Sequence, residues 1–78
     1  DPALVELAPG ECTPEEEPHE GEEFGLVLSG SVELVLGGKP QKIKKGECFY
    51  CKATRKHYII NKKKGPAVLL WVSSPPNF

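Results

Sequence analysis

The sequence predicts an all-β domain that closes on itself as a barrel or sandwich. Eight glycines and eight prolines divide the 78 residues into short segments, which is typical of strands joined by turns rather than of helices. In the segments 24–29 and 67–73 apolar residues occupy both faces of the strand, although an antiparallel sheet normally exposes one face to water. A second sheet or a partner subunit should therefore cover the other face, and we expect a homodimer.

Glycines separate the first three expected strands. Residues 3–8 (ALVELA) form an apolar segment that ends before Gly10. Residues 24–29 (FGLVLS) place Phe, Leu and Leu on one face, and Gly and Val on the other, because successive side chains of a strand point to opposite sides. Gly30 then separates this strand from residues 31–37 (SVELVLG), whose Val, Leu and Leu share a face.

Four further strands follow the Gly37-Gly38 turn. Residues 40–45 (PQKIKK) run to the next glycine turn, and residues 47–51 (ECFYC) carry aromatic side chains. The last two strands lie on either side of Lys64-Gly65-Pro66 and cover residues 56–62 (KHYIINK) and 67–73 (AVLLWVS). No linker, repeat or low-complexity segment divides the chain, so residues 1–78 form a single domain.

Composition excludes several classes of protein. No apolar run approaches the roughly 20 residues that span a bilayer, and no signal peptide is recognisable. Three cysteines are an odd number, which argues against a disulfide framework and favours a reducing compartment, the cytoplasm. A domain of this length buries only about 60% of its unfolded surface, so association with a second copy would stabilise it.

The charges are segregated along the chain. Residues 1–24 hold nine of the eleven acidic residues, and all ten basic residues fall between Lys39 and Lys64. The net charge is only −1, so we expect acidic and basic strands to neutralise one another. The triple lysine at 62–64 should form a solvated hairpin tip. No phosphate loop or aromatic-studded basic motif is present, and we expect no direct contact with nucleic acid.

Polar residues with the chemistry of metal ligands precede the strand at 24–29. Glu17, His19 and Glu23 share parity, so they would share a face of one straight strand. Four residues of extended chain cover about 13 Å, too far for His19 and Glu23 to hold one ion. The chain must turn between them, and Gly21 allows that turn. The other histidine, His57, begins a strand far along the chain, and only a fold that brings this strand beside Glu23 would complete a site. The alternative to a metal site is a polar barrel mouth whose residues form hydrogen bonds with one another and with water.

The spacing of these residues resembles the two motifs of the cupin superfamily. In the first motif, G-x5-H-x-H-x3,4-E-x6-G, this chain has His19-x3-Glu23-x6-Gly30, with Glu17 in place of the first histidine. In the second, G-x5-P-x-G-x2-H-x3-N, it keeps the glycine, the histidine and the asparagine, at positions 46, 57 and 61. Lys52 and Thr54 replace the proline and the second glycine. The stretches HEGEEFGLVLSGSVELVLGG and LLWVSSPPNF are similar to the cupin sensor domains of helix-turn-helix transcriptional regulators.

The resemblance implies a double-stranded β-helix, the cupin or jelly-roll barrel, commonly dimeric and with a pocket in the barrel. It also implies a divalent transition metal, Ni, Mn, Fe or Zn, held at the places of Glu17, His19, Glu23 and His57. Two imidazoles and two carboxylates form a harder ligand set than the family norm, so the sequence does not select among these metals.

The segment 47–51 contributes further candidates. Cys48 and Cys51 point to opposite faces of a strand, which prevents chelation or a disulfide between them. Phe49 and Cys51 share a face and are expected to line the barrel, where they would border a bound ligand. Tyr50, Tyr58 and Trp71 are expected to fill a core or an interface, with their polar tips hydrogen-bonded.

Two functions follow from this sequence. The first is a ligand-sensing domain that binds a small molecule, with or without a metal, in a transcriptional regulator whose DNA-binding domain would precede Asp1. The alternative is a small metal-dependent enzyme, such as a dioxygenase or isomerase, with open coordination positions for substrate.

Overall fold

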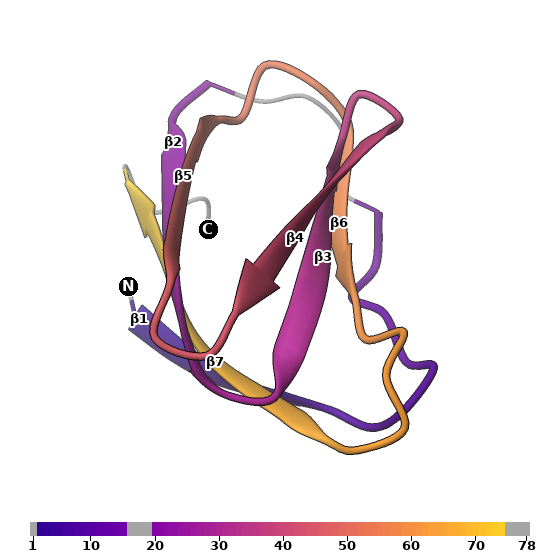
Figure 1. Ribbon diagram of the computed structural model, residues 1–78. Helices are drawn as coiled ribbons and strands as arrows, with labels where there is room; N and C mark the ends of the chain where they lie inside the picture. Colours follow the sequence, from indigo (N-terminus) through magenta and orange to yellow (C-terminus); the bar gives the residue numbers. More distant parts are fainter. Residues whose placement is uncertain (1, 16–19, 75–78) are drawn as a thin grey trace.

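The computed structural model describes residues 2–15 and 20–74, and these form seven strands wrapped around one core (Figure 1). Every strand overlaps a segment expected from the sequence, so the all-β prediction is confirmed. The strands are β1 (Pro2–Leu7), β2 (Glu22–Ser29), β3 (Ser31–Leu36), β4 (Lys39–Lys44), β5 (Cys48–Lys52), β6 (His57–Ile60) and β7 (Ala67–Ser74). The described residues contain no helix that could cross a membrane.

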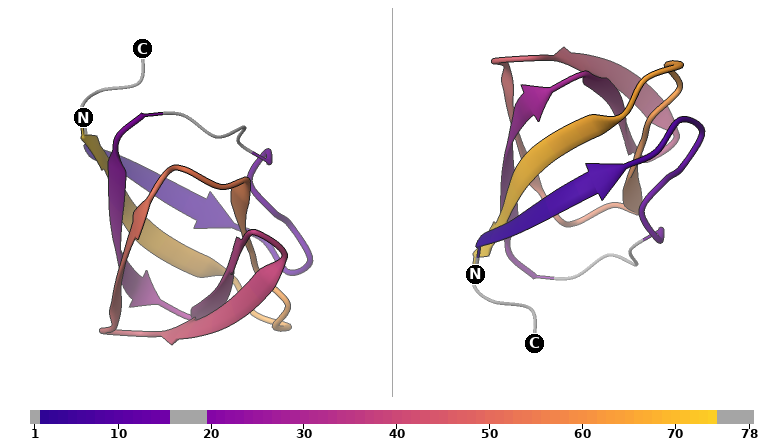
Figure 2. Two further views of the ribbon diagram at one scale, coloured as in Figure 1. Left: turned by 90° about the horizontal axis from the view of Figure 1, so that it is seen from above. Right: turned by 90° about the horizontal axis from the view of Figure 1, so that it is seen from below.

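The strands form two antiparallel sheets. One has the order β1-β7-β2-β5 and the other β4-β3-β6. The views along the barrel in Figure 2 show the two sheets facing each other around the interior. Residues 10–13 run along the free edge of β6, where the Thr13 amide donates to the Ile59 carbonyl at 2.8 Å and the Ile59 amide donates to Thr13 Oγ1 at 2.9 Å.

The inward faces of both sheets supply one hydrophobic core. Its buried members are Leu7, Val27, Val32, Leu34, Ile43, Phe49, Ile59, Ala67, Leu69 and Trp71. On β2 the inward residues are therefore Glu23, Gly25 and Val27, and Phe24, Leu26 and Leu28 face outward. Within this core Phe49 and Trp71 form an edge-to-face pair, with ring centroids 6.1 Å apart.

Gly25 is required by the position of the Phe49 ring. The two residues are cross-strand partners on β2 and β5. A Cβ atom at Gly25 would lie 2.1 Å from Cε2 of Phe49, far inside van der Waals contact. The missing side chain therefore leaves room for the Phe49 ring beside the β2 backbone, where the ring packs against Trp71.

Asn61 joins three parts of the barrel just after β6. Its side chain is fully buried. Nδ2 donates to the Leu7 carbonyl at 3.0 Å and to the Gly65 carbonyl at 2.8 Å. Oδ1 accepts from the Lys63 amide at 2.9 Å. The asparagine of the second motif thus acts within the fold, where it fixes the end of β1 and the β6–β7 loop.

Candidate metal centre at one end of the barrel

The structure brings Glu23 and His57 together although they are 34 positions apart in the sequence. Glu23 lies near the start of β2, and His57 is the first residue of β6, which belongs to the other sheet. Both side chains point into the barrel, and they are 1% and 0% exposed. Oε1 of Glu23 and Nε2 of His57 lie 2.9 Å apart, so the pair bridges the two sheets.

The turns beside these strands aim the two side chains. Gly21 has a φ of 130°, and its carbonyl accepts a hydrogen bond from the Ala53 amide at 3.0 Å. That bond ties the loop between β5 and β6 to the turn before β2. The turn that the sequence predicts at Gly21 is therefore present, and it lies at the end of the barrel where β2 and β6 begin (Figure 1).

His57 has a defined tautomer because its second ring nitrogen faces a backbone carbonyl. Nδ1 lies 2.9 Å from the Arg55 carbonyl oxygen. A carbonyl can only accept, so Nδ1 must carry a proton and donate it. In the neutral ring Nε2 is then an acceptor, and its lone pair faces the Glu23 carboxylate.

Glu23 is held on both sides within its own sheet. Its cross-strand neighbours are Cys51 on β5 and Ser73 on β7. The Ser73 hydroxyl donates to Oε2 at 3.2 Å, while Oε1 faces His57. The carboxylate therefore keeps one orientation, with the oxygen nearer His57 aimed at the imidazole.

The contact between Glu23 and His57 requires either a proton or a metal ion between the two facing atoms. A carboxylate oxygen and an imidazole lone pair at 2.9 Å repel each other unless a proton or a metal ion lies between them. Oxygen and nitrogen ligands bind transition metals at about 2.0–2.2 Å, so two adjacent ligands of one ion lie roughly 3 Å apart. A backbone carbonyl on the far nitrogen is also what orients a metal-bound histidine. The pair fits two positions of a metal site.

The remaining predicted ligands fall outside the described part of the chain. Glu17 and His19 belong to residues 16–19, which the structure does not describe. Within residues 2–15 and 20–74, no group of three His, Cys, Asp or Glu side chains forms a metal-type cluster. Glu23 and His57 therefore supply half of the predicted set.

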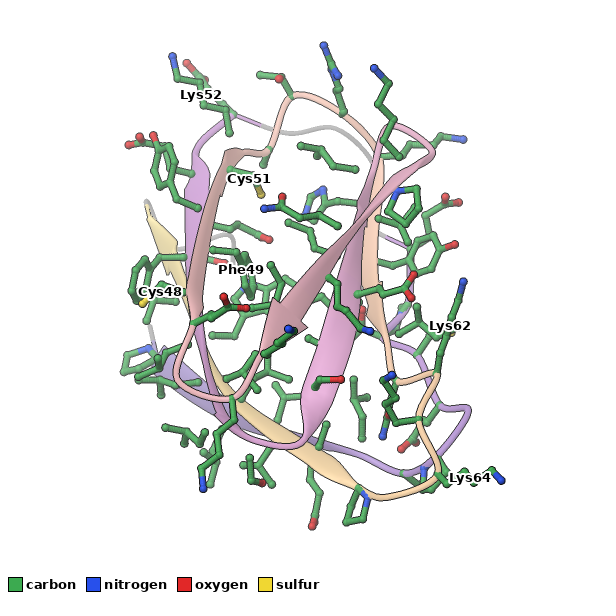
Figure 3. All side chains as sticks on the ribbon, in the orientation of Figure 1. Cys48, Phe49, Cys51, Lys52, Lys62 and Lys64 are labelled. Carbon is green, nitrogen blue, oxygen red and sulfur yellow. The ribbon has the colours of Figure 1, made fainter. Side chains whose placement is uncertain are left out.

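The two residues predicted to border a ligand lie inside the barrel on β5. Figure 3 shows Phe49 and Cys51 pointing inward and Cys48 pointing outward. Cys51 is buried next to Glu23, and Cys48 is exposed. The opposite orientation of the two cysteines matches the sequence prediction. Phe49 packs against Trp71 in the core.

A groove of about 340 Å³ lies on the outer side of the smaller sheet. Its lining residues are Cys12, Thr13, Glu15, Tyr58 and Ile60. The outward residues of β6 contribute to this groove, whereas His57 and Ile59 point inward. The groove is thus separate from the Glu23–His57 pair.

Two contributors to the site were missed by sequence reasoning. Ser73 shares the inward face of β7 with Leu69 and Trp71, and that parity could have identified it. The Arg55 contribution is a backbone carbonyl, which leaves no signal in the sequence.

The fold and the site define a small antiparallel barrel with a buried His–Glu pair at one end. A model of the cupin domain family matches residues 3–73, and the chain belongs to this family. The predicted resemblance is therefore confirmed.

Solved structures share this fold. A sugar phosphate isomerase of the cupin superfamily from Silicibacter pomeroyi is 28% identical with a TM-score of 0.83; the match covers 96% of this chain and 50% of the isomerase. The cupin domain of an XRE-family transcriptional regulator from Enterobacter cloacae is 24% identical with a TM-score of 0.87, covering 99% and 82%. A predicted oxalate decarboxylase from Thermotoga maritima is 24% identical with a TM-score of 0.83, covering 92% and 63%. This chain thus spans half of the isomerase.

Proposed function

We propose that this chain is a small-molecule-binding cupin domain whose site holds a divalent transition metal, and that it is the sensing part of a transcriptional regulator. The observation that carries the proposal is the buried contact of 2.9 Å between Glu23 and His57, with His57 Nδ1 held by the Arg55 carbonyl. Enclosing two such groups away from water is unfavourable unless a proton or a metal ion joins them, and the orientation of His57 by a backbone carbonyl supports the metal ion.

Each residue of the site would have a separate role in binding. His57 and Glu23 would present a nitrogen and an oxygen to the ion, and Ser73 would keep the carboxylate from rotating. Glu17 and His19 would complete the ligand set. The bound metal would supply a Lewis acid that attracts a carboxylate, hydroxyl or carbonyl group of the ligand. Cys51 and Phe49, which both point into the barrel from β5, would border that ligand.

The likeness to the XRE-family regulator's cupin domain supports the sensing role. That match has a TM-score of 0.87 and covers 99% of this chain and 82% of that domain. A DNA-binding domain of such a regulator would lie outside these 78 residues. The second candidate, a metal-dependent isomerase or dioxygenase, is favoured by one observation, the 28% identity to the sugar phosphate isomerase.

Metal content tests this proposal. Protein purified without chelators should contain close to one equivalent of Ni, Mn, Fe or Zn per chain by elemental analysis. His57→Gln and Glu23→Gln should each lower this content at least tenfold, because even loss of an outer-shell partner of a ligand costs 10–100-fold in metal affinity. Cys12→Ser, at an exposed position, should leave it unchanged. Circular dichroism must show that both site variants are folded.

Two results would contradict the metal site. One is folded wild-type protein without metal whose thermal stability does not respond to added Ni or Mn. The other is metal content that survives His57→Gln. A helix-turn-helix encoded upstream of Asp1 would support the sensor, and turnover of a sugar phosphate by the metal-loaded domain would support the enzyme instead.

A further inference from the structure

The outer face of the three-stranded sheet carries apolar and basic side chains in separate places. Four residues of β3, β4 and β6 belong to the core, namely Val32, Leu34, Ile43 and Ile59. Their neighbours along each strand therefore point outward. The registers align Lys42, Glu33 and Ile60 in one row across the sheet, and Cys12 pairs with Ile60 beyond β6. The row thus joins β4 to the segment that runs along β6.

The apolar part of this face is the groove of about 340 Å³ beside β6. Tyr58 and Ile60 line it from β6, and Cys12 and Thr13 line it from the neighbouring segment. The Thr13 hydroxyl already accepts a hydrogen bond from the Ile59 amide, so the groove offers a partner mainly apolar contact. Its volume falls in the range of small-ligand pockets, about 300–1,000 Å³, and gives room for one or two side chains.

The basic part of the face is a lysine cluster formed by Lys42 on β4 and by Lys62 and Lys63, which follow β6. Lys62 points outward beside β6 (Figure 3), and its Nζ lies 3.3 Å from Oε1 of Glu33, the one acidic residue of the three strands. Lys63 lies beside Lys42, and its hydrogen bond and positive charge lower the pKa of Lys42, whereas Glu33 acts in the opposite direction. Three ammonium groups therefore share one carboxylate. An anion beside Lys42 and Lys63 would reduce the repulsion between them.

The groove and the lysine cluster adjoin along β6. The cluster begins just beyond Ile60, where β6 ends. Residues 10–13 run antiparallel to β6, so Glu15 lies at the opposite end of the groove, toward Tyr58. Ile60 and Lys42 are separated by two strand spacings, about 10 Å, which about three residues of extended chain cover. An elongated partner with an apolar part and an acidic part therefore fits this face in one direction.

We propose that this face binds an extended acidic peptide segment of a partner protein, with apolar side chains in the groove and carboxylates over Lys42 and Lys63. Charge complementarity favours an acidic partner, because the lysines outnumber the carboxylate at this end of the sheet. A single strand of nucleic acid would need several aromatic side chains on which bases stack, and β3, β4 and β6 offer one phenol ring, that of Tyr58. Extended peptides bind by placing alternate side chains in pockets.

The position of the groove makes this inference independent of the proposed function. Glu23 and His57 point into the barrel, whereas the groove lies on the outer side of the sheet. Peptide binding therefore needs no metal, and a failure of either proposal leaves the other intact.

The probe is the nonapeptide GLSLSESEG labelled with fluorescein at its amino terminus. In an extended chain its leucines and glutamates share one face. Fluorescence polarisation with increasing protein should give a dissociation constant below about 1 mM. The matched peptides GLSLSQSQG and GASASESEG remove the charges and the apolar side chains in turn, and each should bind at least about fivefold more weakly.

Two exposed cysteines locate the bound peptide. Cys12 lines the groove, whereas Cys48 lies on β5 in the other sheet. Unlabelled peptide at about three times its dissociation constant occupies about three quarters of the chains, so alkylation of Cys12 by iodoacetamide should become about fourfold slower. The alkylation rate of Cys48 should stay constant.

Variants test the part played by the lysines. Lys42→Gln and Lys63→Gln change exposed side chains, so both variants should remain folded. Each should weaken binding about twofold to threefold, as loss of an exposed ion pair does, and the double variant should weaken it about fivefold. Lys52→Gln removes the same charge from the other sheet and should leave binding unchanged. Raising the salt concentration from about 0.1 to 1 M shortens the Debye length from about 10 to 3 Å and should weaken wild-type binding by a similar factor.

Three results would overturn the inference. They are no binding at a protein concentration of about 1 mM, equal binding of the glutamate and glutamine peptides, and binding that Lys42→Gln combined with Lys63→Gln leaves unchanged. Unchanged alkylation of Cys12 in the presence of bound peptide would place the peptide elsewhere and contradict the groove. Tighter binding of a uridine octanucleotide than of GLSLSESEG would assign the face to single-stranded nucleic acid instead.

Discussion

Replacing Asn61 by Asp should destabilise the barrel strongly although the two side chains have nearly the same shape. Nδ2 of Asn61 donates to the Leu7 and Gly65 carbonyls at 3.0 and 2.8 Å. A carboxylate oxygen at that place cannot donate, and it would face both carbonyl oxygens. Only the bond from the Lys63 amide to Oδ1 would survive the substitution.

The expected loss follows from those contacts. Each hydrogen bond contributes about 1 kcal/mol, and a buried carbonyl without a donor costs about 1–3 kcal/mol. The Leu7 bond is buried, whereas the Gly65 carbonyl lies at an exposed residue and can recover water. We therefore expect a decrease of about 3 kcal/mol in the free energy of unfolding at pH 7. For a domain of this size that corresponds to a decrease in Tm of at least about 12 °C.

Urea denaturation followed by circular dichroism measures this change, with Gln41→Glu as the control. Both substitutions convert an amide to an acid, but Gln41 is exposed, so its variant should stay within about 0.5 kcal/mol of the wild type. The introduced carboxyl group of Asn61→Asp should have a raised pKa, because its protonated form can donate again. Its deficit should therefore shrink as the pH falls. Equal stability of the two variants at pH 7 would refute the role given to the Asn61 donors.

Two further predictions concern the packing of β2 against β5 and the hydrogen bond on their outer face. Gly25→Ala should lower the free energy of unfolding by about 1–3 kcal/mol, because the new Cβ would lie 2.1 Å from Phe49. In a double-mutant cycle, Phe49→Leu should remove most of the loss caused by Gly25→Ala. If the losses of the two substitutions simply add, the contact between Gly25 and Phe49 is contradicted. The hydrogen bond that the Tyr50 hydroxyl donates to Glu22 raises the pKa of the phenol above 10.0. Since the folded-state pKa is the higher one, the bond stabilises the fold below the unfolded pKa and is lost as the pH rises through the folded pKa. Ultraviolet titration at high pH should show a lower midpoint for ionisation of Tyr50 in Glu22→Gln than in the wild type. The titration of Tyr50→Phe gives the signal of Tyr58, which is subtracted from both curves. An unchanged midpoint would refute the hydrogen bond.

The alternation of side chains let the sequence predict much of this molecule. Parity within residues 47–51 correctly placed Cys48 and Cys51 on opposite faces, because the period of a strand is a local property of the backbone. The glycines marked the turns, and Gly21 has the positive φ that its turn needs. The motif spacing predicted that Glu23 and His57 belong to one site, and the structure places them 2.9 Å apart.

Tertiary structure alone decided which face of each strand is buried. On β2 both faces are apolar, and only the cross-strand pairing of Gly25 with Phe49 shows that Val27 belongs to the core and Phe24 to the outer surface. The Ser73 hydroxyl on Glu23 comes from a sheet neighbour 50 positions along the chain. The carbonyl that sets the tautomer of His57 is local, two residues earlier at Arg55, but it is a backbone group that no side-chain pattern reveals. The contact of Ser73 with Glu23 and the choice of buried face depend on strand order and register between distant segments, and local alternation does not encode either of them.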